Sequence, residues 1–377
     1  MTTTTTMRMP AEWAEHEGTL MAWPTRADLW GAVLDAAKDE YAEVARAVAR
    51  FEPVLMVAPP GAGAEARERC GQGVEAGHHA IRPGIDHPID HPINHPIEVI
   101  ELPIDDSWFR DSGPIFVTDG AGSRAGVDFR FNAWGGKHSP WDADDRISAL
   151  LLERLGVERV VSSLILEGGS ITVDGEGTLI TTEQCLLHPN RNPGWTREQI
   201  EDELKTRLGV TTVIWLPYGG AEDFETDGHV DGCCAFIAPA TVIVQLPEDP
   251  AHPDYERCRA NLEILRTSRD AQGRTLTVIP VPQSNRVAVD GEEVEVGYLN
   301  FYLPNGGVVV PIAGVPADEG ALAALAKAMP DREVVGVRTR TIAFGGGGIH
   351  CITQQIPQIR QTPQTPHAPQ TPKAAAI

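Results

Sequence analysis

Short runs of apolar residues alternate along most of the chain with segments whose apolar residues recur every three or four positions. The second pattern predicts amphipathic helices at residues 31–50, 254–270 and 318–329. The short runs "VLMVAP", "VTTVIWLP", "TVIVQLP" and "GVVVPI" predict buried strands between them. This alternation indicates an α/β fold. The apolar stripe of the first helix consists of Val33, Leu34, Ala37, Tyr41, Val44, Ala45 and Val48.

Two local signals refine this pattern. Thr196 and Gln199 have the spacing of a capping box, which predicts a helix that begins there and ends near Gly209. Residues 170–182, "SITVDGEGTLITT", contain two β-rich runs around an Asp-Gly pair and predict a hairpin. Because hairpins join antiparallel strands, we do not expect a simple parallel sheet.

Length and composition suit one large closed architecture. The chain has 377 residues, of which 42% are hydrophobic, so it can bury a sizeable core. No run approaches the roughly 18 apolar residues of a membrane span, and "MTTTTTMRMP" at the N-terminus lacks the apolar run of a signal peptide. We therefore expect a cytoplasmic protein that does not enter a membrane.

Charge narrows the range of partners. With 31 basic and 53 acidic side chains the net charge is −22, which argues against nucleic acid and would attract small cations. The alternative is that the acidic side chains serve only to keep the protein soluble and carry no information about its substrate. The sequence leaves the oligomeric state open, and a homo-oligomer is compatible with it.

Two segments are low in complexity. Residues 85–97 read "IDHPIDHPINHPI", where His87, His91 and His95 each precede a proline. Proline favours an extended chain, which separates residues four apart by roughly 13 Å, so we expect no metal site there. Residues 358–377 are rich in Gln, Thr and Pro and predict a disordered tail after a single domain of residues 1–357.

The six cysteines include no C-x-x-C pair, so neither a disulfide framework nor a zinc site of the Cys type is expected. Cys233 and Cys234 are adjacent in an apolar run. On a strand their side chains would point to opposite faces, and we interpret both as small buried residues.

Four segments place a reactive or charged side chain beside glycine or a turn, where backbone can approach a ligand closely. They are "DDSWFRDSGP" (105–114), "LEGGS" (166–170), "TDGHVDG" (226–232) and "GGGGIHC" (345–351).

Cys351 is the candidate nucleophile, because a glycine run precedes it; the alternative is an inert buried thiol. His229 is the candidate base. Its segment is interpreted as a turn or a strand; if Val230 points into the core from a strand, His229 and Asp231 share the opposite face. Glu167 would hold the imidazole. No metal or organic cofactor is needed for such a site.

The residues around Trp108 fit one class of substrate. Asp106 and Asp111 flank Trp108 and Arg110, and a local ion pair is the alternative reading of these charges. A guanidinium is a planar cation with five donors, for which opposed carboxylates are natural partners. Its carbon is a poor electrophile, so attack on it requires a thiolate.

Several motifs together make the chain resemble the agmatine deiminases of the guanidine-modifying superfamily, which are related to bacterial peptidylarginine deiminases. The resemblance spans nearly all of residues 8–356 and implies a five-bladed α/β propeller, the pentein fold, with a central active site. The motifs are "RMPAEWAEHEGTLMAWP", "DDSWFRDSGP", "FNAWGG", "LEGGSITVDGEGTLITTEQCLLHPNRNP", "GHVDG", "YLNFYLPNGGVVVP" and "GGGGIHCITQQ".

By matched motif, Cys351 corresponds to the nucleophile, His229 to the general acid/base and Glu167 to its carboxylate partner. The implied reaction is hydrolysis of agmatine to N-carbamoylputrescine and ammonia through a covalent amidino-cysteine, within putrescine and polyamine biosynthesis. Deimination of arginine or peptidyl arginine, or transfer of the amidino group to an amine, are the alternatives. The chain departs from the family at Gly348, where Asn is usual, in the histidine repeat and in the tail.

The resemblance also implies how substrate is held. Asp111 and Asp231 correspond to the carboxylates that grip the guanidinium, and Trp108 to a residue that packs against substrate. The acidic loop "GGAEDFETDG" precedes His229. We expect Glu225 or a neighbour to meet the distal ammonium of agmatine; a solvated acidic loop is the alternative.

Overall fold

The computed structural model describes residues 7–71, 93–283 and 286–359. Most of the histidine repeat, with His87 and His91, and most of the tail after residue 357 lie outside them, so the predictions for these two segments stay predictions. No helix within the described ranges is long and apolar enough to cross a lipid bilayer.

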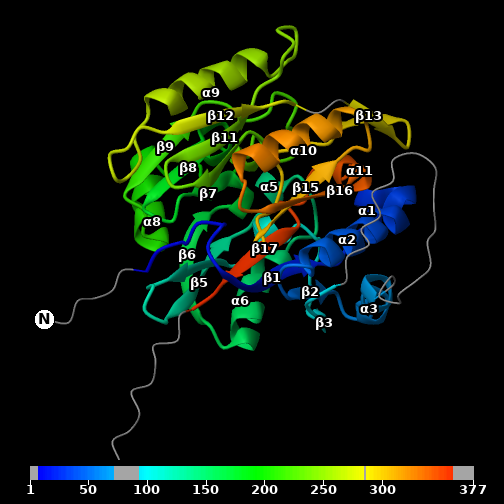
Figure 1. Cartoon of the computed structure of the whole chain (residues 1–377). Coiled ribbons are helices and arrows are strands. Elements are labelled where there is room, and N and C mark those ends of the chain that lie inside the picture. The colour runs from blue at the N-terminus through cyan, green and yellow to red at the C-terminus, as the bar shows by residue number, and fades with distance from the viewer. Residues whose placement is uncertain (1–6, 72–92, 284–285, 360–377) are drawn as a thin grey trace, which may run out of the picture.

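Five units of similar topology form the described structure (Figure 1). In each unit the first strand pairs antiparallel with the second, and the second pairs in parallel with the third. A helix connects the second strand to the third, because parallel neighbours require a crossover. In the fourth unit the first strand is reduced to one bridge between Tyr302 and Val309.

The elements of the units are as follows. The first contains β4 (Ile115–Thr118), β5 (Arg124–Arg130), α6 (Asp144–Leu155) and β6 (Glu158–Ile165). The second contains β7 (Ile171–Val173), β8 (Thr178–Thr182), α8 (Arg197–Leu208) and β9 (Thr212–Leu216). The third contains β10 (Cys234–Ala238), β11 (Thr241–Gln245), α9 (Tyr255–Thr267) and β12 (Thr277–Val281). The fourth contains β15 (Gly307–Ile312), α10 (Ala317–Ala328) and β16 (Glu333–Arg338). The fifth contains β17 (Thr353–Pro357), β1 (His16–Ala22), α2 (Leu34–Val48), β2 (Val54–Ala58) and β3 (Ile97–Glu101).

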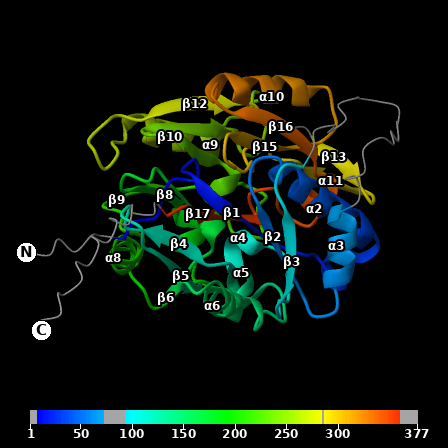
Figure 2. The ribbon, with the colours of Figure 1, turned by 60° about the horizontal axis from the view of Figure 1, so that its bottom comes forward.

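The fifth unit joins the two ends of the described chain. β17 pairs antiparallel with β1, so that Gln355 lies opposite Thr19. Figure 1 shows α6, α8 and α9 at the edge of the molecule, and both Figure 1 and the rotated view of Figure 2 place β1 and β17 in the interior. The predicted five-bladed α/β propeller is confirmed.

The remaining elements connect the units and shape their ends. They are α1 (Ala27–Trp30), η1 (Gly31–Val33), α3 (Gly63–Gly71), α4 (Phe109–Ser112), α5 (Ala133–Gly136), η2 (Gly168–Ser170), α7 (Glu183–Leu186), η3 (Val230–Gly232), β13 (Arg286–Val289), β14 (Glu292–Glu295) and α11 (Arg340–Phe344).

The local predictions agree closely with these bounds. Thr196 caps α8 through a complete capping box, and Gly209 ends the helix in a left-handed conformation. The predicted hairpin is the β7–β8 pair. One local prediction is wrong: Cys233 precedes β10 rather than lying on it, although Cys233 and Cys234 are both buried as expected.

The apolar faces of the helices pack against the sheets and form the core between them. On α6, Ile147 and Leu151 are four residues apart, lie on one side of the helix and are fully buried. They belong to a cluster that includes Phe109 of α4 and Phe116 of β4. This packing fixes α4, and with it Asp111 of the same helix, against the rigid part of the fold.

Candidate active site

The segments that lead into the first strands of the five units bring polar side chains together. Because the topology repeats, these segments meet although they are far apart in the chain. The structure therefore unites the five residues that the sequence marked for catalysis and guanidinium binding, and adds a sixth. They are Asp111 of α4, Glu167 before η2, His229 and Asp231 at η3, Asn300 before the Tyr302 bridge, and Cys351 before β17.

Cys351 is buried at the centre of this group. Its Sγ lies 3.5 Å from Oδ2 of Asp231 and 3.4 Å from Oδ1 of Asn300. Burial, with the Asp231 and Asp111 carboxylates, raises the pKa of the Cys351 thiol well above its usual range. A cation that neutralised these carboxylates would make the thiolate easier to form.

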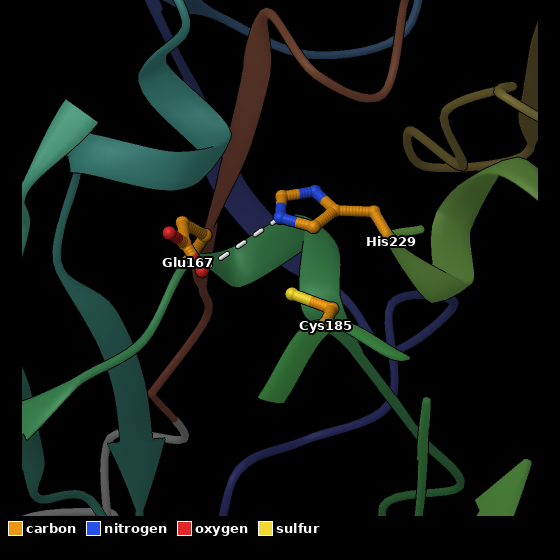
Figure 3. Close-up of side chains that lie close together, drawn as sticks. All are labelled: Glu167, Cys185 and His229. Carbon is orange, nitrogen blue, oxygen red and sulfur yellow. Dashed lines mark ion pairs between the residues drawn. The ribbon is translucent and has the colours of Figure 1, made fainter. Parts of the chain in front are cut away.

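His229 lies between two carboxylates and is almost inaccessible to solvent. Its Nδ1 is 3.9 Å from Oδ1 of Asp111 and its Nε2 is 3.7 Å from Oε2 of Glu167 (Figure 3). Burial opposes the imidazolium, but Asp111, Cys185 and Glu167 together raise the pKa of His229 well above its ordinary value. A protonated His229 is placed to act as an acid.

Of the turn and the strand that the sequence left open around His229, the structure has a turn. Residues Val230–Gly232 form a 3₁₀ turn, so alternation along a strand does not explain how His229 and Asp231 come together. Val230 is buried as expected. Both polar side chains instead approach Gly169, where an added Cβ would lie 2.6 Å from Nδ1 of His229 and 2.9 Å from Oδ2 of Asp231. The glycine is needed here because any side chain would enter the site.

Glu167 is fully buried and held from behind by Arg191. Nε of Arg191 donates to Oε1 of Glu167 at 2.7 Å, and Nη1 of Arg191 donates to Asp227 at 2.6 Å. Burial opposes ionisation of Glu167, but Arg191 and His229 outweigh it and lower the pKa of Glu167 to about 2. The carboxylate facing His229 is therefore permanently charged near neutral pH.

Asp111 is oriented by two donors. Its Oδ1 accepts from the backbone N–H of Gly169 at 2.9 Å, and its Oδ2 accepts from Nε1 of Trp134 at 2.9 Å. The alternative of a local ion pair in this segment is wrong. Arg110 instead pairs with Glu12, and Asp106 pairs with Arg26.

Asp231 is held by a second imidazole. Nδ1 of His350 is 2.8 Å from Oδ2 of Asp231, and Nε2 of His350 is 2.9 Å from Oε2 of Glu12. Burial opposes a charged Asp231, but His350 outweighs it and lowers the pKa of Asp231. Glu12 itself is fixed by Arg110 and by the N–H of Leu303.

A pocket leads from Asp111 and Cys351 to the surface. Trp108, which stacks on Trp30 with ring centroids 5.8 Å apart, forms part of its wall. Glu225 lies at the same pocket with its side chain half exposed, 2.8 Å from His138. The structure thus places Trp108 and Glu225 beside the site without showing what they bind. The lining residues are Leu29, Trp108, Asp111, Trp134, His138, Glu225, Thr226, Gly345, Gly346, Gly347 and Cys351.

The residues of this arrangement that the sequence reasoning missed include Trp134, Asn300 and His350. Trp134 has a left-handed backbone with φ of 54°, next to two glycines in "FNAWGG". Asn300 lies in "YLNFYLPNGG", and His350 directly precedes the candidate nucleophile. These three residues all lie in the family motifs, and this is the signal by which the sequence could have identified them. An added Cβ at Gly348 would lie 2.5 Å from Oδ1 of Asn300, so glycine there leaves space for that side chain.

Comparison with known proteins gives a consistent picture. The family model of the Porphyromonas-type peptidyl-arginine deiminases matches residues 8–357. The agmatine deiminase of Stutzerimonas stutzeri is 43% identical over 372 residues, covering 93% of this chain and 95% of that protein. The structure of the Enterococcus faecalis agmatine deiminase matches with a TM-score of 0.83 at 35% identity, covering 93% of this chain and 96% of that chain. A C. jejuni agmatine deiminase with substrate bound matches with a TM-score of 0.80 at 26% identity, covering 94% and 97%.

Proposed function

The chain belongs to the Porphyromonas-type peptidyl-arginine deiminase family, and we propose that it hydrolyses agmatine to N-carbamoylputrescine and ammonia. The observation that carries the proposal is the position of Cys351 Sγ, 3.5 Å from Asp231, in a pocket that Asp111 also lines. A thiol beside two carboxylates suits a substrate whose reactive carbon belongs to a planar cation. Relatives that are 43% and 42% identical are agmatine deiminases.

Asp111 and Asp231 bind the guanidinium group in this proposal. Without a cation, burial and Asp231 raise the pKa of Asp111, with His229 opposing the rise. A guanidinium between the two carboxylates removes this repulsion and also favours loss of the Cys351 thiol proton to solvent, which leaves the thiolate. Binding the substrate therefore activates the nucleophile that attacks it.

The first half-reaction forms a covalent intermediate. The Cys351 thiolate attacks the guanidinium carbon and gives a neutral tetrahedral adduct. The His229 imidazolium, whose raised pKa keeps it protonated, donates its proton to one NH₂ group, which leaves as ammonia. An amidino-thioether cation remains on sulfur, and His229 is now neutral.

The second half-reaction consumes water. Neutral His229 takes a proton from a water molecule while its oxygen adds to the amidino carbon. The new tetrahedral species expels the Cys351 thiolate, and loss of one proton from the resulting cation gives the ureido product. Glu167 stabilises the imidazolium that forms again, since its charge persists near neutral pH.

The distal end of the substrate lies along the pocket wall. Trp108, fixed by its stacking on Trp30, offers an apolar face to the methylene chain. Glu225 offers a carboxylate at the same pocket, and its pairing with His138 lowers its pKa. This favours a terminal ammonium over the carboxylate that arginine carries there. The other three acids of the loop are engaged elsewhere: Glu222 with Arg286, Asp223 with Thr226, and Asp227 with Arg191.

The experiment measures ammonia release with agmatine, arginine and an arginyl peptide, each with and without an added amine acceptor. We expect hydrolysis of agmatine to dominate. Comparable hydrolysis of arginine or the peptide would make one of them the substrate. An amidinated acceptor without ammonia would instead identify an amidinotransferase.

A further inference from the structure

A buried cysteine that the proposed mechanism does not use lies directly beside the general acid/base. Cys185 belongs to α7, whose first turn is capped by the Thr182 side chain, which accepts from the N–H of Cys185 at 3.2 Å. This cap fixes the direction in which Cys185 points. Figure 3 shows its sulfur near both the imidazole of His229 and the carboxylate of Glu167.

The three side chains have the spacing of metal ligands. Oε2 of Glu167, Sγ of Cys185 and a ring nitrogen of His229 lie within 4.8 Å of one another. Bonds of about 2.0–2.3 Å from one tetrahedral ion place its ligand atoms roughly 3.3–3.8 Å apart. The 3.7 Å between Nε2 of His229 and Oε2 of Glu167 already falls in this range.

The atoms that face this space are also unsatisfied. Oε2 of Glu167 and Nε2 of His229, which lie 3.7 Å apart, are buried and have no hydrogen-bond partner within the described part of the chain. Buried polar atoms are normally paired, because leaving one unpaired costs free energy. A cation bound here would satisfy both atoms at once.

We propose that Glu167, Cys185 and His229 form an inhibitory binding site for Zn²⁺. Thiolate, imidazole and carboxylate together suit zinc, whereas Mg²⁺ and Ca²⁺ prefer oxygen ligands alone. The thiolate and carboxylate charges balance the ion. Binding displaces the thiol proton and, from protonated His229, the ring proton, and both go to solvent.

The other oxygen of Glu167 stays bound to Arg191, which would hold the carboxylate in place as a ligand. Nε2 of His229 lies next to Glu167, whereas Nδ1 lies next to Asp111, which lines the pocket. Metal on Nε2 prevents the imidazolium from forming and keeps the remaining ring proton on Nδ1, so His229 can no longer give a proton to ammonia and then take one from water. The inhibitory part of this inference rests on the proposed function, whereas the binding part does not. Asp111 lines the pocket and lies 3.9 Å from the imidazole, so the proposed site lies next to the pocket.

Binding is tested in the Cys351→Ser protein, which removes the thiol of the candidate nucleophile. Co²⁺ serves as a spectroscopic probe for Zn²⁺, and equilibrium dialysis gives the stoichiometry and affinity. We expect one ion per chain and a thiolate-to-cobalt charge-transfer absorption that excess Zn²⁺ abolishes. Adding Cys185→Ser should remove the absorption and weaken Zn²⁺ binding at least about 10–100-fold. Mutation of a residue that only orients a metal ligand already lowers metal affinity by this factor, and loss of the ligand itself should lower it at least as much.

Cys70→Ser, in the same background, is the matched control, since Cys70 is buried in α3 and belongs to a hydrophobic cluster that does not include Cys185. It should keep both the absorption and the affinity. His229→Gln provides a second ligand variant, and circular dichroism shows which variants fold. Retention of the cobalt–thiolate absorption in the folded Cys185→Ser protein, or no binding at all in Cys351→Ser, would overturn the proposal.

The inhibition is tested with native Cys351. Zn²⁺ should inhibit agmatine hydrolysis reversibly, Mg²⁺ should not, and Cys185→Ser should raise the inhibitory Zn²⁺ concentration by the same factor as the dissociation constant. Equal inhibition of the wild type and Cys185→Ser would refute the site. Absence of turnover with agmatine before any metal is added would refute the proposed function and leave the binding result standing.

Discussion

Nδ1 of His350 lies 2.8 Å from Oδ2 of Asp231, the same oxygen that lies 3.5 Å from Sγ of Cys351. The residue before the nucleophile thus holds the carboxylate that faces the sulfur. Burial and Arg110 oppose a charged His350, but Glu12 and Asp231 raise its pKa. A chain of alternating carboxylates and imidazole therefore runs from Glu12 to the thiol.

His350→Leu should lower kcat/KM for agmatine about 10–100-fold, because Asp231 loses the partner that orients it. His350 acts as a positioning residue that lowers the pKa of Asp231. Its loss should raise that pKa and shift the acidic limb of the kcat/KM profile to higher pH. Glu12→Gln changes the partner of His350 and leaves His350 itself in place. It should shift the acidic limb to higher pH as well, but by less. A uniform loss at every pH would assign His350 a structural role only.

Cys351→Ser should reduce turnover by at least about a thousandfold, because a hydroxyl is a far weaker nucleophile than a thiolate. Its melting temperature should stay close to that of the wild type, since the substitution is nearly isosteric. Mass spectrometry of the wild type quenched during turnover should reveal an amidino adduct on Cys351. Near-normal activity of the serine variant would rule out covalent catalysis.

The free protein should contain no Cys351 thiolate at neutral pH. Burial and the two carboxylates raise the pKa of this thiol, so the ultraviolet thiolate absorbance of the wild type, minus that of Cys351→Ser, should appear only in alkaline solution. Asp231→Asn removes one negative charge and should move the titration to lower pH. A thiolate already present at pH 7 in the substrate-free wild type would contradict this expectation.

Glu225→Gln should weaken the preference for agmatine over arginine. A partly desolvated charge interaction contributes about 1–3 kcal/mol, so the ratio of kcat/KM values should fall roughly ten- to a hundredfold. Glu222→Gln is the matched control, because Glu222 belongs to the same loop but pairs with Arg286 and does not line the pocket. If the ratio is unchanged in Glu225→Gln, the selectivity depends on other residues.

Glu167→Gln should destabilise the fold by about 3–5 kcal/mol, because it leaves Arg191 buried without its charged partner. Glu183→Gln breaks a partly exposed Glu–Arg pair with Arg197 and should cost at most about 1 kcal/mol. Denaturant unfolding at pH 7 measures both changes.

The contribution of Glu167 to the free energy of unfolding should also depend on pH. The pKa of Glu167 is lowered from an ordinary 4.5 to about 2 in the folded protein. Its stabilising effect is therefore complete above pH 4.5 and is lost as the pH falls towards 2. The difference in unfolding free energy between wild type and Glu167→Gln should shrink over this window. A difference that stayed constant would mean that its charge is not the cause.

The sequence by itself determined the local elements and the types of reactive residue. Thr196 and Gln199 identified the start of α8, and the period of apolar residues identified α2, because both signals arise between residues a few positions apart. The family motifs marked Cys351 and His229 in the same way.

The tertiary structure decided how these pieces meet. Thr19 lies beside Gln355, and His229 lies between Asp111 and Glu167, because five units with the same strand order close around a common centre. The units share topology rather than a visible sequence repeat, so no window of the sequence records their contacts.

Because such contacts leave no signal in the sequence, strand alternation was the wrong reason for bringing His229 and Asp231 together, and several site residues were missed. Alternation along a strand was applied where a 3₁₀ turn lies, since the turn depends on packing against Gly169. The contacts of Asn300 with Cys351 and of Cys185 with His229 join positions 51 and 44 residues apart. The type of a side chain is given by the sequence at one position, but the residues that it contacts depend on how the whole chain packs.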